Sequence, residues 1–265
     1  MTTSIIKADL NHSLPLLLIA PLQKRIAMTN IAEQTLASIV TGNHQVVPVL
    51  EKYNLDFCCK GKRTLAQACA EKGIRIESIT EELKSLSDVA GRQQMPFTEM
   101  NAEQLISYIL IHHHFYVKQS MPTIMAHLNK VATKHGDKFP YMRDVYDMFA
   151  IITREMTLHM EKEEEVLFPR IKEVESLYKS GRSSEILPGY IQTLVHAMEA
   201  DHEEAGDIMY QIRTVTNNYT PPDDACTTFK VTLAELKEFE EDLHKHVHIE
   251  NNILFPKTMQ YESNK

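Results

Sequence analysis

The sequence predicts an all-α protein, an up-down four-helix bundle preceded by a small helical domain. Glycine is scarce, at 8 of 265 residues, and 43% of the chain is hydrophobic, a balance that favours helices with a packed core. Four long helical patterns follow one another with short breaks between them. Short connections make antiparallel neighbours of successive helices, which is the up-down arrangement.

The small domain is expected over residues 31–90. Thr64 is placed to cap a helix that stops at Gly73, and Ser78 with Glu81 forms a capping box for the next helix. These start and stop signals predict several short helices rather than one long one.

An adjacent pair of cysteines, Cys58 and Cys59, lies in a short loop of this domain. The following stretch, residues 87–98, has the composition of a linker. We therefore expect the small domain to fold apart from the bundle, which is predicted over residues 98–260.

The bundle itself is predicted from four helical patterns, at residues 101–132, 141–179, 185–217 and 225–256. Pro122 interrupts the first pattern and predicts a kink there. The Phe168-Pro169 and Phe255-Pro256 pairs predict bends or ends in the second and fourth helices, because proline has no N–H to donate.

A motif that occurs twice points to a metal centre. His159-x-x-x-Glu163 precedes x-x-Val-Leu-Phe-Pro, and His246-x-x-x-Glu250 precedes x-x-Ile-Leu-Phe-Pro. At ~3.6 residues per turn, positions i and i+4 lie about 40° apart on a helix, so each motif directs an imidazole and a carboxylate to one point. Two such helices that face each other offer carboxylates that can bridge two ions.

The other two helices are expected to add one histidine each. His114 and His202 lie on the buried stripes of the first and third patterns, at the depth of the repeated motif. His112 and His113 compete with His114, since the helix face separates them only in part. Four imidazoles and two carboxylates then meet in the middle of the bundle, which predicts a site for two metal ions.

The remaining histidines are expected to be solvated or in loops. His196, His244 and His248 have polar helical neighbours, and His135 lies in a predicted loop. A ferritin-like site is rejected, although Glu-x-x-His occurs at Glu199-x-x-His202 and Glu241-x-x-His244, because these motifs lie on consecutive helices. Histidine with bridging carboxylate suits iron, manganese or zinc, and a nitrogen-rich site without thiolate favours two irons.

Composition and charge exclude several classes of protein. A net charge of -8 argues against a nucleic-acid partner. The apolar run 14–22 is interrupted by Pro15 and Pro21 and is too short to span a membrane, which takes ~20 residues. Four cysteines are too few for a disulfide scaffold and indicate a reducing compartment. Residues 1–30 are interpreted as a disordered tail or an overlong start.

From about residue 31 to 260 the sequence resembles the repair-of-iron-centres family of the YtfE and ScdA type, in which a hemerythrin-like bundle follows a Cys-Cys domain. Three stretches carry the resemblance: Leu55 to Leu65, Asp201 to Gly206, and the motif that ends at Pro256. The resemblance implies a cytoplasmic protein with two iron ions that restores iron–sulfur clusters damaged by nitric oxide or peroxide, with the damaged iron–sulfur proteins as its partners.

The resemblance also implies roles for individual residues. The iron ligands carried over by position are His114, His159, Glu163, His202, His246 and Glu250, with His135 as a further histidine near the site. Glu155 and Asp201 match acidic positions beside the metals. Glu155, Cys58 and Cys59 are the candidate catalytic residues.

Three functions compete at this point. The first is a repair factor that delivers or recovers iron, in which Cys58 and Cys59 receive iron, dock the partner or exchange electrons. The second is an enzyme that reduces nitric oxide at the di-iron centre, with Glu155 relaying protons. The third is a carrier or sensor of O2 or NO. The Cys-Cys domain favours the first over the third, and nothing in the sequence separates the first from the second. A homodimer through the N-terminal domain is also expected.

Overall fold

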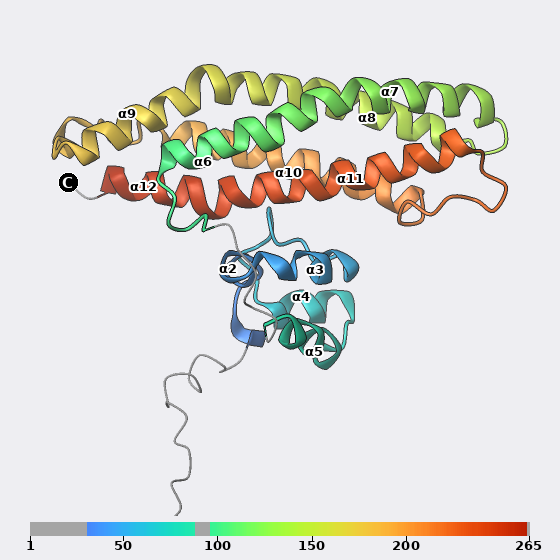
Figure 1. Cartoon of the computed structure of the whole chain (residues 1–265), viewed down its shortest axis with the longest axis horizontal. Coiled ribbons are helices and arrows are strands. Elements are labelled where there is room, and N and C mark those ends of the chain that lie inside the picture. The colour runs from blue at the N-terminus through green and yellow to red at the C-terminus, as the bar shows by residue number, and fades with distance from the viewer. Residues whose placement is uncertain (1–30, 88–95, 264–265) are drawn as a thin grey trace, which may run out of the picture.

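The computed structural model describes residues 31–87 and 96–263. Within these ranges the chain forms helices and turns, with one isolated β-bridge between Thr35 and Thr64. A long bundle of four antiparallel helical rods lies beside a small domain of short helices (Figure 1). The all-α, up-down prediction is confirmed. The expected tail 1–30, and most of the expected linker, lie outside the described residues.

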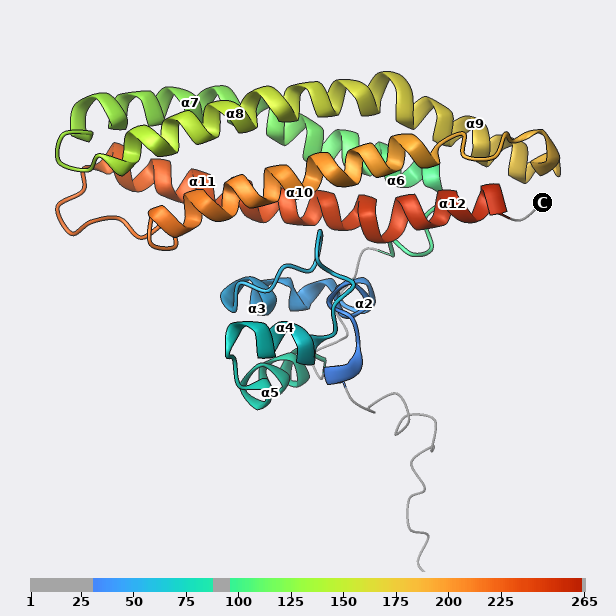
Figure 2. The ribbon, with the colours of Figure 1, turned by 180° about the vertical axis from the view of Figure 1, so that it is seen from behind.

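Three of the four rods contain a short π-helical segment, and each of these three is therefore described in three parts. The first rod is α6 (Ala102–Tyr108), η3 (Ile109–His114) and α7 (Phe115–His135). The second is α8 (Tyr141–Lys162), η4 (Glu163–Leu167) and α9 (Phe168–Lys179). The third is α10 (Gln192–Val215), and the fourth is α11 (Thr227–Ile249), η6 (Glu250–Leu254) and α12 (Phe255–Ser263). Figure 2 shows the same rods from behind.

Three helix ends differ from the prediction by more than two residues, and one of them is the end of the fourth rod, at Ser263 rather than at 256. The third rod begins at Gln192 rather than at 185, because Pro188 and the left-handed Gly189 (φ 72°) hold the preceding segment in turns. The first rod runs on to His135, so this histidine is helical and not in a loop.

The Phe-Pro pairs do not end their helices. Each pair follows a π-helical segment, in which the Phe168 N–H donates to the Glu163 carbonyl and the Phe255 N–H to the Glu250 carbonyl. These bonds reach back five residues instead of four. The wider turn lets the helix continue through a residue that has no N–H of its own.

The small domain consists of η1 (Ile31–Glu33), α2 (Leu36–Gly42), η2 (His44–Val46), α3 (Val47–Lys52), α4 (Leu65–Lys72) and α5 (Ile76–Ser87). Thr64 and Gln67 form a capping box, and α4 ends at Gly73 with φ 64°, as its sequence predicts. The predicted capping box of Ser78 and Glu81 is wrong, because α5 already begins at Ile76, which packs against the core.

The small domain is packed onto the bundle. One continuous apolar cluster joins Leu36, Leu50 and Phe57 of the small domain to Leu236 and Leu243 of α11. In both ribbon views α2 and α3 face the bundle, and α4 and α5 lie on the side away from it (Figures 1 and 2). Whether the two parts fold independently of each other stays a prediction.

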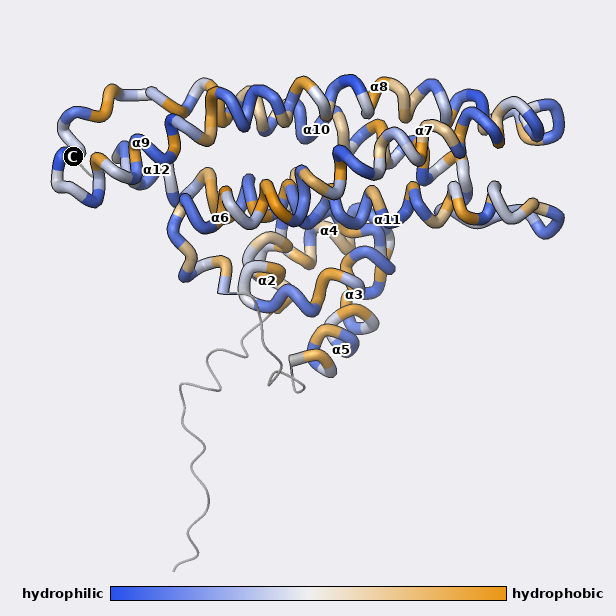
Figure 3. Tube along the Cα trace, turned by 45° about the horizontal axis from the view of Figure 1, so that its top comes forward, coloured by the Kyte–Doolittle hydropathy of each residue, from blue (hydrophilic) through white to orange (hydrophobic). Residues whose placement is uncertain are grey.

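A second apolar cluster fills the other end of the bundle, around Phe168, Val195 and Leu254. Hydrophobic and hydrophilic residues alternate along every rod (Figure 3), as an amphipathic packing face requires. The two clusters meet at one level of the bundle, and polar side chains are buried at that level. No helix in the described residues is long and apolar enough to cross a membrane.

Candidate metal centre

The buried polar level lies between the two apolar clusters on every rod. His114 follows Ile109 of one cluster and precedes Val117 of the other, and Glu163 lies between Met160 and Leu167 in the same way. Three of the side chains sit at the edges of π-helical segments: His114 ends η3, Glu163 begins η4 and Glu250 begins η6. Such segments are frequent at functional sites, because they redirect side chains without ending the helix.

Six side chains form two overlapping groups that share both carboxylates. One group is His114, Glu163, His246 and Glu250; the other is His159, Glu163, His202 and Glu250. Within each group the candidate ligand atoms lie within 4.8 Å of one another. All six residues are at most 2% exposed. Two histidines and two shared carboxylates per group make a site for a pair of ions.

Each carboxylate lies between histidines from different helices. Oε2 of Glu163 is 3.3 Å from Nε2 of His114 and 3.4 Å from Nε2 of His159. Glu250 places Oε1 3.0 Å from Nε2 of His246 and Oε2 3.1 Å from Nε2 of His202. The Nε2 atoms therefore converge from all four rods.

Three of the histidines are oriented through their other ring nitrogen. Nδ1 of His114 is 2.7 Å from Oε1 of Glu164, and Nδ1 of His202 is 2.9 Å from Oδ1 of Asn251. Nδ1 of His159 is 3.3 Å from Oδ2 of Asp201. An oxygen at Nδ1 holds the proton there and leaves the Nε2 lone pair free for a metal.

Glu164 and Asn251 were not found from the sequence. The signal for them is the repeat itself, because each directly follows a motif glutamate and orients a histidine of another rod. Asp201, which the family resemblance places beside the metals, lies against His159 and Lys162.

The pKa shifts of the six residues indicate that their charges do not balance one another. Burial, together with the charge of Glu250, raises the pKa of the Glu163 carboxyl to about 8. Although burial opposes it, His246 and His202 hold the pKa of Glu250 well below its usual range. Burial lowers the pKa of His246 to about 4. Although burial opposes it, Glu250 and Glu163 raise the pKa of His202 to about 9. A buried carboxyl that still retains a proton indicates a centre that lacks positive charge.

The buried donor atoms fit metal ions. Nε2 of His114, both oxygens of Glu163 and Oε2 of Glu250 make no hydrogen bond to any part of the chain that the structure describes. Nε2 of His159 and Nε2 of His202 lie 3.0 Å apart, although the Nδ1 atom of each ring faces an oxygen. Both nitrogens are directed at the same point, so bound cations would be coordinated by them.

Two predicted site residues are not brought into the groups. His135 ends α7, and Nε2 of this histidine lies 3.2 Å from Sγ of Cys226. Because α7 has 21 residues, it separates His135 from His114 by about 30 Å. Glu155 is half-buried one turn before His159, and the guanidinium of Arg154 donates to it at 2.7 Å.

Several histidines lie where the sequence did not place them. His244 and His248 were expected in solvent but are 8% and 1% exposed, because the small domain covers that face of α11. Nδ1 of His244 lies 2.6 Å from Oε1 of Glu51. His113 is buried behind the centre, with its ring parallel to that of His246 at a centroid distance of 5.4 Å. His196 is exposed, as expected.

The Cys-Cys loop lies next to the centre without contributing to the two groups. The thiol of Cys59 lies 3.5 Å from the His202 carbonyl, within hydrogen-bonding distance. Oδ1 of Asp56 accepts the N–H groups of Cys58 and Cys59 at 3.0 Å each, and these three residues form a further potential metal-binding group. The hydrogen bond between the two thiols raises the pKa of Cys58 and lowers that of Cys59, so Cys59 ionises first.

A four-helix bundle whose centre is lined by paired histidines and glutamates defines the class of hemerythrin-like metal proteins. Comparison with known families agrees, since residues 105–258 match the hemerythrin HHE cation binding domain. Residues 32–87 match ScdA_N, a domain of unknown function. The cofactor of the centre is the predicted pair of iron ions, and each of the two groups could hold a metal ion.

Similar proteins of known name identify the family within this class. The iron-sulfur cluster repair protein YtfE of Shigella boydii is 31% identical over 230 residues, which cover 87% of this chain and 98% of the relative. The proteins of that name from Citrobacter koseri and Escherichia coli K12 are 30% and 31% identical, with the same shares covered. The chain therefore belongs to the YtfE family of two-domain, hemerythrin-like proteins.

Proposed function

We propose that this protein repairs iron–sulfur clusters that nitrosative or oxidative stress has damaged, by supplying or recovering iron. The name of the relatives, iron-sulfur cluster repair protein, supports the activity. The paired ligand groups support an iron-containing mechanism. The proposed partners are damaged iron–sulfur proteins of the cytoplasm.

The observation that carries the proposal is the contact between the dithiol loop and a metal-ligand histidine. Sγ of Cys59 reaches the backbone of His202, and Nδ2 of Asn252 donates to the Cys58 carbonyl at 3.3 Å. Asn252 follows Asn251, which orients His202. The loop thus holds two thiols, which can accept iron, beside the helices that bear the candidate metal ligands. A bundle that only carried O2 or NO would not need thiols there.

The chain's own residues favour a centre that can release iron. Imidazoles and two shared carboxylates would hold the iron here, without thiolate, and the iron would supply Lewis acidity. Thiolates are the softer ligands that retain iron in clusters. Glu163 and Glu250 each have two oxygens, so each carboxylate can move between bridging two ions and binding one.

An anaerobic assay tests the proposal. The iron-loaded protein is mixed with a hydratase whose [4Fe–4S] cluster has been damaged by nitric oxide, and regained hydratase activity is followed together with the iron left on the repair protein. We expect activity to return in proportion to the repair protein added, with matching loss of its iron. Repeated turnover of nitric oxide to nitrous oxide, without hydratase recovery, would instead establish the nitric oxide reductase.

The reductase alternative assigns proton transfer to Glu155. In the structure Glu155 lies outside both ligand groups and its carboxylate is held by Arg154. This position favours the repair factor. The proposed homodimer through the N-terminal domain stays a prediction, which the mass of the protein in solution tests.

A further inference from the structure

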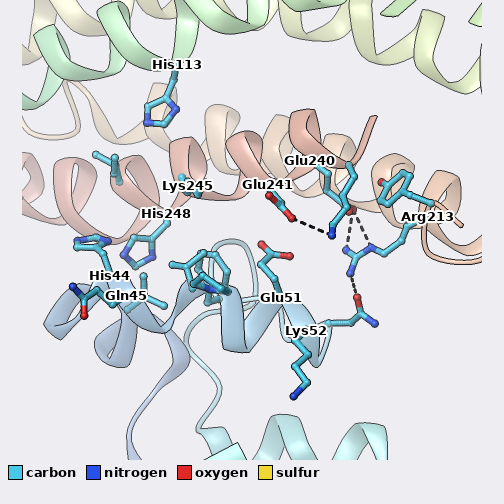
Figure 4. A pocket seen from close by; sticks show the side chains of 18 of the residues that line it. His44, Gln45, Glu51, Lys52, His113, Arg213, Glu240, Glu241, Lys245 and His248 are labelled. Carbon is cyan, nitrogen blue, oxygen red and sulfur yellow. Dashed lines mark hydrogen bonds and ion pairs between the residues drawn. The ribbon is translucent and has the colours of Figure 1, made fainter. Parts of the chain in front are cut away.

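A cavity of ≈ 750 Å³ lies between part of the small domain and the bundle (Figure 4). Its walls come from α2, η2 and α3 on one side and from α11 on the other, with Tyr108 and His113 from the first rod. This volume is in the range of sites for small organic ligands, ~300–1,000 Å³. Neither the cysteines nor the six ligand residues line it.

One end of the cavity is built from flat rings set edge to face. His44 lies 4.8 Å from Phe97 at an interplanar angle of 79° and 5.7 Å from His248 at 80°. Phe97 in turn lies 4.8 Å from Tyr108 at 73°. The half-buried rings of His44 and Tyr108 line the cavity and offer flat apolar surface to a ligand. Burial lowers the pKa of His44, so this wall is uncharged at neutral pH.

The other end carries charges, most of which are matched within the protein. The guanidinium of Arg213 lies 2.9 Å from Glu240, and Lys237 lies 3.7 Å from Glu241 (Figure 4). Two further lining charges are matched by residues outside the cavity, Glu51 by His244 and Lys52 by Glu82. Lys245 lines the cavity too, and it makes no ion pair with a carboxylate of residues 31–87 or 96–263. One positive charge is thus left for a ligand.

The ring of His113 would lie between a ligand in this cavity and the ring of His246 in the metal centre. His113 lines the cavity, and its ring is stacked at 4° on that of His246. Nδ1 of His113 lies 3.0 Å from Asp242, whereas its Nε2 is buried and without a hydrogen bond in the described chain.

We propose that the cavity is a binding site for a planar aromatic molecule that carries an anionic group. The ring stacks among His44, Phe97 and Tyr108, and the anion pairs with Lys245. The site is distinct from the metal centre, and the proposal does not depend on cluster repair. Because the cavity has walls from both domains, the ligand also holds them together.

Flavin mononucleotide serves as the probe, and riboflavin as the same ring without the phosphate. We expect the iron-loaded protein to quench flavin fluorescence saturably with one site per chain, and to bind flavin mononucleotide about threefold more tightly than riboflavin. Absence of saturable quenching with both flavins would overturn the proposal. Equal affinity for both would overturn the anionic part of it.

Substitutions locate the site. Gln45→Trp places a large ring in the cavity and should lower the affinity for both flavins at least about tenfold. Gln119→Trp, on the exposed face of α7, is its control and should not change either affinity. Lys245→Glu should weaken flavin mononucleotide and leave riboflavin unchanged, whereas Lys230→Glu, an exposed position on the same helix, should affect neither.

Melting temperature and iron content show that each variant is folded and loaded. Gln45→Trp with unchanged iron and unchanged flavin affinity would place the flavin elsewhere and refute this cavity as the site.

Discussion

Glu163 and Glu250 are fully buried in a bundle core, where a carboxylate is costly unless it is paired or bound to a cation. The chain tolerates both because each lies between two imidazoles of different rods. Each is followed by a residue that orients the histidine contributed by the other rod, Glu164 for His114 and Asn251 for His202. The duplicated motif therefore encodes both the ligands and part of their support.

Removing either shared carboxylate should remove most of the iron. Glu163→Ala or Glu250→Ala takes away a ligand common to both groups, so we expect iron to fall from about two per chain to well under one. Glu165→Ala, an exposed neighbour, is the control. Metal analysis measures the content, and full occupancy in both variants would show that these carboxylates are not ligands.

Removing an orienting residue should loosen the iron without abolishing the site. In Glu164→Ala, His114 loses the oxygen at 2.7 Å that holds its Nδ1 proton, and loss of such partners typically costs ~10–100-fold in metal affinity. We expect iron to pass faster to a chelator than from the wild type or from Glu165→Ala. An unchanged transfer rate would show that Glu164 pairs with Lys118 and does not support the metal centre.

At the scale of elements, the sequence predicts what helical periodicity and spacing determine. The four rods, the end of α4 at Gly73 and the shared depth of His114, His159, His202 and His246 all follow from local signals. The π-helical segments do not, because a widened turn depends on how the ligands pack across the bundle. Pro169 and Pro256 then lie inside continuous rods, although proline alone predicts an end.

Helical periodicity could not predict the contacts between the two domains. His244 and His248 have polar helical neighbours, which indicates solvent, yet the small domain covers both. His135 was selected by family position, but its place on the first rod puts it beside Cys226. A pattern along one helix carries no information about a surface that another domain covers.

Breaking the buried pair of His244 and Glu51 should weaken the packing of the small domain. The two side chains are 11% and 15% exposed, so His244→Ala leaves a carboxylate unpaired and should cost about 3 kcal/mol in the free energy of unfolding. Adding Glu51→Ala should recover at least about 1 kcal/mol. Urea unfolding measures both, with the exposed His196→Ala as control.

Iron content should stay unchanged in His244→Ala, since His244 belongs to neither ligand group. Purely additive losses in the two single variants would show that the pair makes no net interaction across the domain contact.

At the scale of the whole molecule, the metal centre lies where the two apolar clusters meet, so all four rods depend on it. Without cations, unsatisfied nitrogen and oxygen atoms remain at that level. We expect removal of iron by a chelator to lower the melting temperature by about 5–10 °C. Glu163→Ala should show little further change on chelation, and equal melting curves for iron-loaded and iron-free wild type would contradict a buried metal centre.

The last prediction concerns the two functions of the domain contact, packing and transfer. Cys58→Ser with Cys59→Ser keeps side chains of similar size and leaves the six ligand residues untouched, so iron content and melting temperature should match the wild type. Cluster repair should nevertheless fall at least about tenfold, because serine is a harder ligand that neither ionises at neutral pH nor binds iron as thiolate does.

The two single variants sharpen this test. Since Cys59 ionises before Cys58 and is the thiol that lies against His202, Cys59→Ser should account for most of the defect and Cys58→Ser for less. Cys226→Ser, at the far end of the bundle, is the matched control and should repair clusters normally. Full repair by the double variant would mean that the dithiol loop only packs the small domain onto α10. Iron would then have to leave the centre by a route that does not use Cys58 or Cys59.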